Sequence, residues 1–124
     1  SEMCIRDRGI LSLCEAGTIE LVSSDALVYE NEHNPLTVRQ EYGYAVLSRA
    51  RSTIHVTPGV QERASQFLRH GIRPLDALHL ALAEAGEVTY FCTCDDRLAR
   101  QAKGVDDLAM RIVSPIELVQ EIGE

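Results

Sequence analysis

The sequence has no apolar run close to the roughly 20 residues that a membrane-spanning helix requires. Its first residues also lack the apolar stretch of a secretory signal, and no low-complexity tract favours disorder. These absences predict a protein that does not enter the membrane and that is cytoplasmic. With 124 residues, of which 45% are hydrophobic, the chain has the size and composition of one globular domain.

Cysteine is also sparse. The chain has four cysteines, Cys4, Cys14, Cys92 and Cys94, which are too few and too scattered for a disulfide-dense framework. The spacing Cys92-x-Cys94 is tighter than that of the usual structural zinc site. We therefore expect reduced thiols.

Lysine is nearly absent and positive charge is in the minority. The formal net charge is −7, and Lys103 is the single lysine beside eleven arginines. A protein that coats nucleic acid through bulk electrostatics is normally basic, so this class is excluded. An enzyme that acts on nucleic acid through a local basic rim is not excluded, because arginine suits bidentate contacts to phosphate.

Segments typical of strands alternate with segments typical of helices, which is the pattern of βαβ units and a parallel sheet. The strands are expected at 18–22, 53–56, 88–92 and 111–113. The helices are expected at 11–16, 24–32, 36–50, 58–71, 74–85, 95–102 and 115–122. Ser23 or Ser24 suits the start of the second helix, and Pro74 and Gly86 suit the two ends of the most apolar one. The order predicts a three-layer α/β domain with a parallel sheet flanked by helices.

Acidic residues that follow strands or open helices are the first candidates for a site, because ligands of open parallel sheets bind beyond the carboxyl ends of the strands. Glu30 follows Ala26 and Leu27 at helical spacing, which predicts an inward-facing carboxylate that needs a partner. Asp76 lies in the first turn of the apolar helix, where it could equally complement the helix dipole. His79 lies one turn after Asp76 and could orient it, although we interpret it as a packing residue.

Two further acids, Asp95 and Asp96, directly follow the strand expected at 88–92. Thr93 and Asp96 are spaced as in a capping box, which assigns Asp96 a structural role and leaves Asp95 to point into a cleft. Carboxylates that converge at one sheet edge repel each other unless a hard cation, Mg²⁺ or Mn²⁺, lies between them. Such an ion activates water for attack on a phosphodiester. The residues thus predict metal-assisted phosphodiester hydrolysis.

Three spaced segments form a specific combination: Pro74-Leu-Asp-Ala-Leu-His-Leu-Ala, Tyr90-Phe-Cys-Thr-Cys-Asp-Asp-Arg-Leu and Ile112-Val-Ser-Pro-Ile-Glu-Leu. The combination resembles the C-terminal half of PIN domains, a family of metal-dependent RNA-cleaving enzymes. Those domains have an Asp-Ala-x-His-x-Ala helix, a strand that ends in Thr-x-Asp, and a closing strand followed by proline and a short helix. The segment Ile19-Glu-Leu-Val-Ser-Ser-Asp-Ala-Leu-Val-Tyr-Glu-Asn resembles the part that carries the second acid of the family.

The resemblance covers about residues 9–122 and implies roles for individual residues. Glu30 matches the second acid, Asp76 the third and Asp95 the fourth, so all three are expected to hold Mg²⁺ or Mn²⁺ and to be catalytic. Thr93 would line the site, and Asp96 would support it. Among small members of the family, of the VapC-like type, the resemblance implies a toxin of a toxin-antitoxin pair. Its expected partners are an RNA substrate, an antitoxin protein and a second copy of itself.

The chain departs from the family at its N-terminus. PIN domains begin with a strand that ends in a catalytic Asp, and Asp7 does not match it because no apolar strand precedes Asp7. Residues 1–8 resemble translated sequencing-adapter read-through, so we interpret them as a non-native segment. We therefore expect a single PIN-like domain at 9–124 whose first strand is missing. The missing Asp puts the activity of this chain in doubt, although an active nuclease is expected in the parent protein.

Two alternatives come from other classes. In the first, the chain is a non-catalytic PIN-like module whose acidic cleft only binds protein or RNA. In the second, it is a phosphoacceptor domain of the receiver type, which also uses clustered acids with Mg²⁺. The second needs a lysine after the last strand, and no lysine follows Lys103.

Overall fold

The computed structural model describes residues 20–122. Its first half contains β1 (Val22–Ser24), α2 (Asp25–Glu32), α3 (Thr37–Leu47), β2 (Ser52–Ile54) and α4 (Pro58–Leu68). The second half contains α5 (Pro74–Ala85), β3 (Tyr90–Cys92), α6 (Asp96–Lys103), β4 (Arg111–Val113) and α7 (Pro115–Ile122). Strands and helices therefore alternate in the order that the sequence predicts.

Several expectations fall outside the described residues. These are the non-native segment 1–8, the helix at 11–16, the start of the strand at 18–22 and, with them, the expected loss of a first strand. Among the described residues, the strand expected at 18–22 begins only at Val22. β1 therefore lies later in the chain than its residue pattern predicts. Within residues 20–122, no helix combines the length and the apolarity that crossing a membrane requires.

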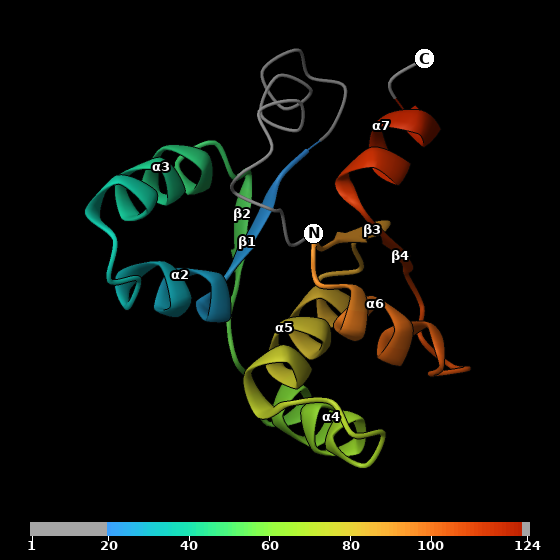
Figure 1. Ribbon diagram of the computed structural model, residues 1–124. Helices are drawn as coiled ribbons and strands as arrows, with labels where there is room; N and C mark the ends of the chain where they lie inside the picture. The colour runs from blue at the N-terminus through green and yellow to red at the C-terminus, as the bar shows by residue number, and fades with distance from the viewer. Residues whose placement is uncertain (1–19, 123–124) are drawn as a thin grey trace.

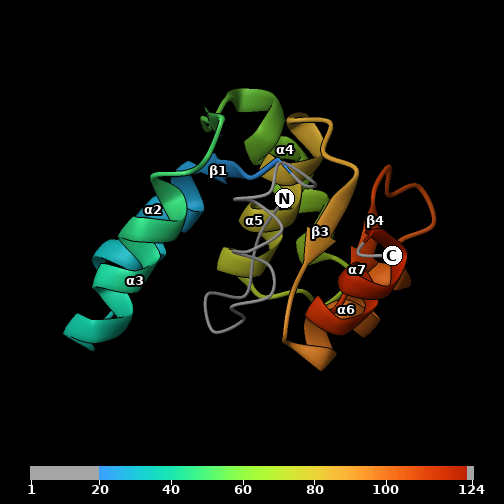
Figure 2. The same cartoon turned by 90° about the horizontal axis from the view of Figure 1, so that it is seen from above.

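All four described strands pair in parallel. β1 pairs with β2, with Ser23 opposite Thr53, and β3 pairs with β4, with Phe91 opposite Ile112. Figures 1 and 2 show helices beside both pairs: α2 and α3 lie outside β1 and β2, α6 and α7 lie beside β3 and β4, and α5 lies between the two pairs. The α/β class is confirmed. Among the described strands, however, the pairs form two separate sheets.

Local sequence signals explain where the helices begin. The Ser24 hydroxyl accepts a hydrogen bond from the backbone N–H of Leu27 (3.2 Å), which caps α2 as predicted. Thr57 caps α4 in the same way, through the N–H of Val60 (3.2 Å). Pro58 and Pro74 occupy first helical positions, where the missing N–H costs nothing. The sequence thus places the starts of α2, α4 and α5.

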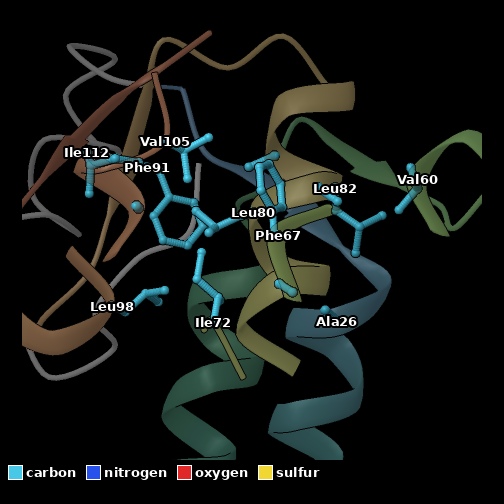
Figure 3. Packing of buried hydrophobic residues seen from close by; sticks show 14 of the residues in the cluster. Ala26, Val60, Phe67, Ile72, Leu80, Leu82, Phe91, Leu98, Val105 and Ile112 are labelled. Carbon is cyan, nitrogen blue, oxygen red and sulfur yellow. The ribbon is translucent and has the colours of Figure 1, made fainter. Parts of the chain in front are cut away.

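The main core is built on α5. Ala77, Leu80, Ala81 and Leu82 of this helix are each no more than 2% exposed. Figure 3 shows Leu80 between the rings of Phe67 from α4 and Phe91 from β3. Each fully buried large apolar side chain contributes about 1.5–3 kcal/mol to folding. Since α5 also carries Asp76 and His79, the best-packed helix of the chain holds two candidate site residues.

A buried ion pair joins α4, α5 and the loop before β4. The Arg63 guanidinium donates to both Glu84 carboxylate oxygens (2.6 and 3.2 Å) and to Asp107 (3.2 Å). It also lies 4.5 Å above the ring centre of Phe67. The Arg63 and Glu84 side chains are only 19% and 17% exposed, so the pair is partly shielded from water. The pair fixes the C-terminal end of α5.

The α2–α3 hairpin depends on a close contact between an asparagine and a glycine. Asn31 is buried and donates from its side-chain amide to the Gln40 carbonyl oxygen (3.2 Å). A Cβ atom on Gly43 would lie only 1.8 Å from the Asn31 side-chain oxygen. Glycine at this position therefore lets α3 approach α2, and this approach holds the helix that carries Glu30.

Candidate metal site

The first candidate acid, Glu30, is bound to a buried histidine. The His79 Nε2 atom in α5 lies 2.7 Å from the Glu30 Oε2 atom in α2. An ionised carboxylate can only accept, so Nε2 carries the hydrogen and donates it. This bond lowers the pKa of Glu30, and the effect exceeds the opposite one of partial burial. Glu30 is therefore ionised at neutral pH.

The Glu30–His79 bond refines two sequence-based interpretations. Glu30 has the partner that its position predicted, but its side chain is 56% exposed, so it lies at the edge of the protein and not inside it. The His79 side chain is 1% exposed and contacts an acid, so it is more than a packing residue. The partners lie 49 positions apart, and no local spacing rule connects α2 with α5. Only the fold could reveal this pair.

Asp76 occupies the third position of α5 and is half-buried. Its pKa is raised, first by burial and then by the negative charge of Asp95, with a smaller contribution from Glu30. Arg73 and, when protonated, His79 act in the opposite direction but do not prevail. Asp76 thus lies in the electrostatic field of both other candidate acids. The structure brings the three acids into one negatively charged region.

Asp95 is the N-cap of α6. One of its carboxylate oxygens, Oδ1, accepts from the backbone N–H groups of Arg97 (3.0 Å) and Leu98 (3.1 Å). The Thr93 hydroxyl accepts in turn from the N–H of Asp95 (3.1 Å) and holds the loop in place. The expected division of roles is therefore wrong in one respect, because Asp95 and not Asp96 makes the cap. Asp96 is the first helical residue and is exposed.

The cap uses only half of the Asp95 carboxylate. Its second oxygen, Oδ2, makes no hydrogen bond to any residue between 20 and 122. A carboxylate that is fixed by one oxygen and open at the other is a suitable metal ligand, since its orientation is set before the ion arrives. Asp95 can therefore cap α6 with one oxygen and act as the predicted metal ligand with the other.

The segment before Asp95 corrects the expectation for the thiols. Cys92, at the end of β3, is a buried thiol, and Thr93 is only 7% exposed. Cys94, however, is disulfide-bonded, so the expectation of reduced thiols is wrong at this position. The loop that leads to the candidate acid is thus constrained by a covalent bond as well as by hydrogen bonds.

The three acids suit a hard cation in charge and in donor type. Glu30, Asp76 and Asp95 all offer oxygen atoms, which Mg²⁺ and Mn²⁺ prefer. Burial is the main cause of the raised pKa of Asp76, and the charges of Asp95 and Glu30 add to it; a divalent cation would relieve this added repulsion. Within residues 20–122, however, no three acidic, histidine or cysteine side chains are gathered at metal-binding distance. The donor set fits an ion chemically, and side-chain movements would have to complete the site.

The family model for the PIN domain matches residues 16–104, which is more than half of the chain. The chain belongs to the PIN-domain family. The match contains Glu30, Asp76 and Asp95, together with Thr93 and His79. PIN domains are typically nucleases and generally use divalent metal ions, so the family agrees with the chemistry of the donor set. No curated protein and no solved structure matches the chain.

Proposed function

We propose that this PIN domain is a Mg²⁺- or Mn²⁺-dependent endoribonuclease. The observation that carries the proposal is that the charges of Asp95 and Glu30 both act on the half-buried carboxylate of Asp76, although the three acids belong to separate segments of the chain. The packing of α2, α5 and α6 does not require these carboxylates to lie near one another, and the repulsion between their negative charges opposes such an arrangement. A bound divalent cation would offset this repulsion and so explain the arrangement.

In the proposed mechanism, the carboxylates of Glu30, Asp76 and Asp95 hold the ion. When bound, the ion supplies an activated water and neutralises charge on the phosphodiester. The Asp95 cap fixes the direction of one ligand, and Thr93 and Asp96 support that loop. Arg73 is exposed, and its positive charge acts to lower the pKa of Asp76. An arginine in this place can contact a phosphate of the substrate through two hydrogen bonds.

The biological setting is also a proposal. Resemblance to small PIN proteins supports a VapC-like toxin that forms a homodimer and is inhibited by an antitoxin protein. We propose that residues 9–124 form its single domain, that it acts on RNA in the cytoplasm, and that residues 1–8 are not native.

The experiment measures Mn²⁺-dependent cleavage of mixed RNA. Because the first acid of the family is expected in an upstream strand, the chain is assayed both as it is and with a PIN-type first strand, ending in Asp, fused in front. Asp76→Asn should abolish cleavage. Asp106→Asn, which changes an exposed acid outside the site, should leave cleavage intact. Cleavage that survives Asp76→Asn would contradict the proposal.

A second candidate function is a binding module that does not cleave. It is favoured by one observation, namely that the three acids are not at metal-binding distance among the described residues. The same assay separates the two functions. A folded fusion protein that binds RNA or a protein partner but never cleaves RNA in Mn²⁺ would establish the binding module.

A further inference from the structure

Glu30 is the candidate ligand that has the least support from its own helix. It lies in the last turns of α2, and its side chain is 56% exposed. A glutamate in this position has several side-chain torsions to fix, and ordering them when a metal binds costs conformational entropy. Water is also an alternative partner for an exposed carboxylate. Some other group must therefore hold Glu30 if it is to contribute to a shared site.

His79 has the properties of such a group. It lies in the middle of α5, and its neighbours in sequence include the fully buried Leu80. Its own side chain is 1% exposed, so packing restricts the rotation of the ring. The rigid ring presents Nε2 to Glu30 at 2.7 Å. The bond connects an exposed candidate acid to α5, the helix with the most buried residues among those that the structure describes.

The same ring is connected to a second acid. Asp76 lies three positions before His79 on α5, which is neighbour spacing on one helix face. A single side chain therefore binds one candidate ligand directly and lies beside another. If His79 were only a core residue, an apolar side chain would fill the same space without the cost of burying a polar ring.

We propose that His79 is a positioning residue that holds Glu30 in place to complete the metal site. The proposal rests on the proposed function, since it assigns Glu30 to that site. His79 does not touch the metal or the RNA, and it acts only through the Glu30 carboxylate. Partners that orient metal ligands in this way typically change metal affinity by about 10–100-fold when they are replaced.

The first experiment concerns Glu30 without any metal. The side-chain order of Glu30 is measured by NMR relaxation in the wild-type chain and in His79→Leu, which keeps the bulk of the ring but removes the donor. His79→Gln is a second variant that retains an N–H donor, and His70→Leu changes an exposed histidine as the control. We expect Glu30 to become mobile only in His79→Leu. Equal order of Glu30 in all four chains would overturn the proposal.

The second experiment measures Mn²⁺ binding by calorimetry in a double-mutant cycle. His79→Leu should weaken binding about 10–100-fold, and His79→Gln should recover most of this loss. In a Glu30→Gln background, His79→Leu should have no further effect, because the group through which it acts is absent. An equal effect of His79→Leu in both backgrounds would overturn the proposal, since it would show a purely structural role.

The two experiments distinguish failure of this proposal from failure of the proposed function. Wild-type protein that binds no Mn²⁺, even with a PIN-type first strand fused in front, overturns the metal site and its positioning residue together. Wild-type protein that binds Mn²⁺ with an affinity that His79→Leu leaves unchanged overturns only the role of His79.

Discussion

Replacing Asp76 with asparagine distinguishes the two roles that its sequence position allows. In the first turn of α5, an acid that complements the helix dipole stabilises the protein by about 0.3–1 kcal/mol, and the substitution would lose this. In the structure, burial and the charges of Asp95 and Glu30 raise the pKa of Asp76 in spite of the dipole. The ionised side chain therefore opposes folding of the metal-free protein. We expect Asp76→Asn to stabilise that protein by about 0.5–2 kcal/mol at neutral pH.

The dependence of folding stability on pH gives the sign of the stability difference between Asp76→Asn and the wild-type protein. Because the pKa of Asp76 is higher in the folded than in the unfolded protein, the folded state holds the proton more tightly. The penalty is absent below the ordinary value of 3.8 and is complete once the pH has passed the raised value. The stability advantage of Asp76→Asn should therefore be present at neutral pH and should disappear as the pH falls through that range.

The assay is urea unfolding with a metal chelator, followed by the same measurement in Mn²⁺. With ion at about 100 times its dissociation constant, the wild-type protein should gain about 2.7 kcal/mol, whereas Asp76→Asn should gain much less. The order of the two stabilities should thus reverse when Mn²⁺ replaces the chelator. If Asp76→Asn is the less stable protein in chelator, the dipole role dominates and the reasoning is refuted.

Five other substitutions, at four positions, test the structure around the site. Gly43→Ala should destabilise the protein by about 1–3 kcal/mol through its clash with the buried asparagine of α2. Gly59→Ala should be neutral or stabilising by up to about 1 kcal/mol in urea unfolding, because its Cβ meets only a hydroxyl at 3.8 Å; equal losses for the two glycines would contradict the packing argument. Asp95→Asn should retain the α6 cap and lose Mn²⁺ affinity in calorimetry, whereas Asp95→Ala should also cost about 1 kcal/mol; a large stability loss in Asp95→Asn would refute this division. Arg63→Met should cost about 1–3 kcal/mol, because it leaves the partly buried Glu84 carboxylate without its hydrogen-bond partner, and a loss below about 0.5 kcal/mol would show that Glu84 finds water instead.

Local signals in the sequence predict most of the elements. Proline, serine and glycine at helix ends place α2 and α5 correctly, and Arg111–Val113 is a strand as expected. The helix expected at 36–50 ends at Leu47 instead, and that expected at 58–71 ends at Leu68. Both are followed by hydrogen-bonded turns, in which helix-compatible residues continue beyond the last regular turn. Residue propensity alone does not distinguish the last turn of a helix from the hydrogen-bonded turn that follows it.

The candidate site was predictable only in part. Asp76 is predicted because it opens a helix, Asp95 because it follows a strand, and Glu30 because of its helical spacing after apolar residues; the family pattern assigns their roles. The structural role at the start of α6 was assigned to Asp96 although Asp95 makes the cap, since either residue suits a cap and only the backbone geometry after Cys92 decides. The Glu30–His79 bond joins helices that are far apart in the chain. Such tertiary contacts depend on how helices are placed, and no residue spacing encodes them.

The most direct test of the account asks whether one cation binds among all three acids. Mn²⁺ is titrated into isotopically labelled protein, and the paramagnetic broadening of each amide signal is followed by NMR. The account predicts that signals near Glu30, Asp76 and Asp95 broaden first and together, and that Asp76→Asn removes this broadening. Broadening that begins elsewhere, such as at the acids of α7, or that spreads evenly over the acidic surface would contradict a shared metal site.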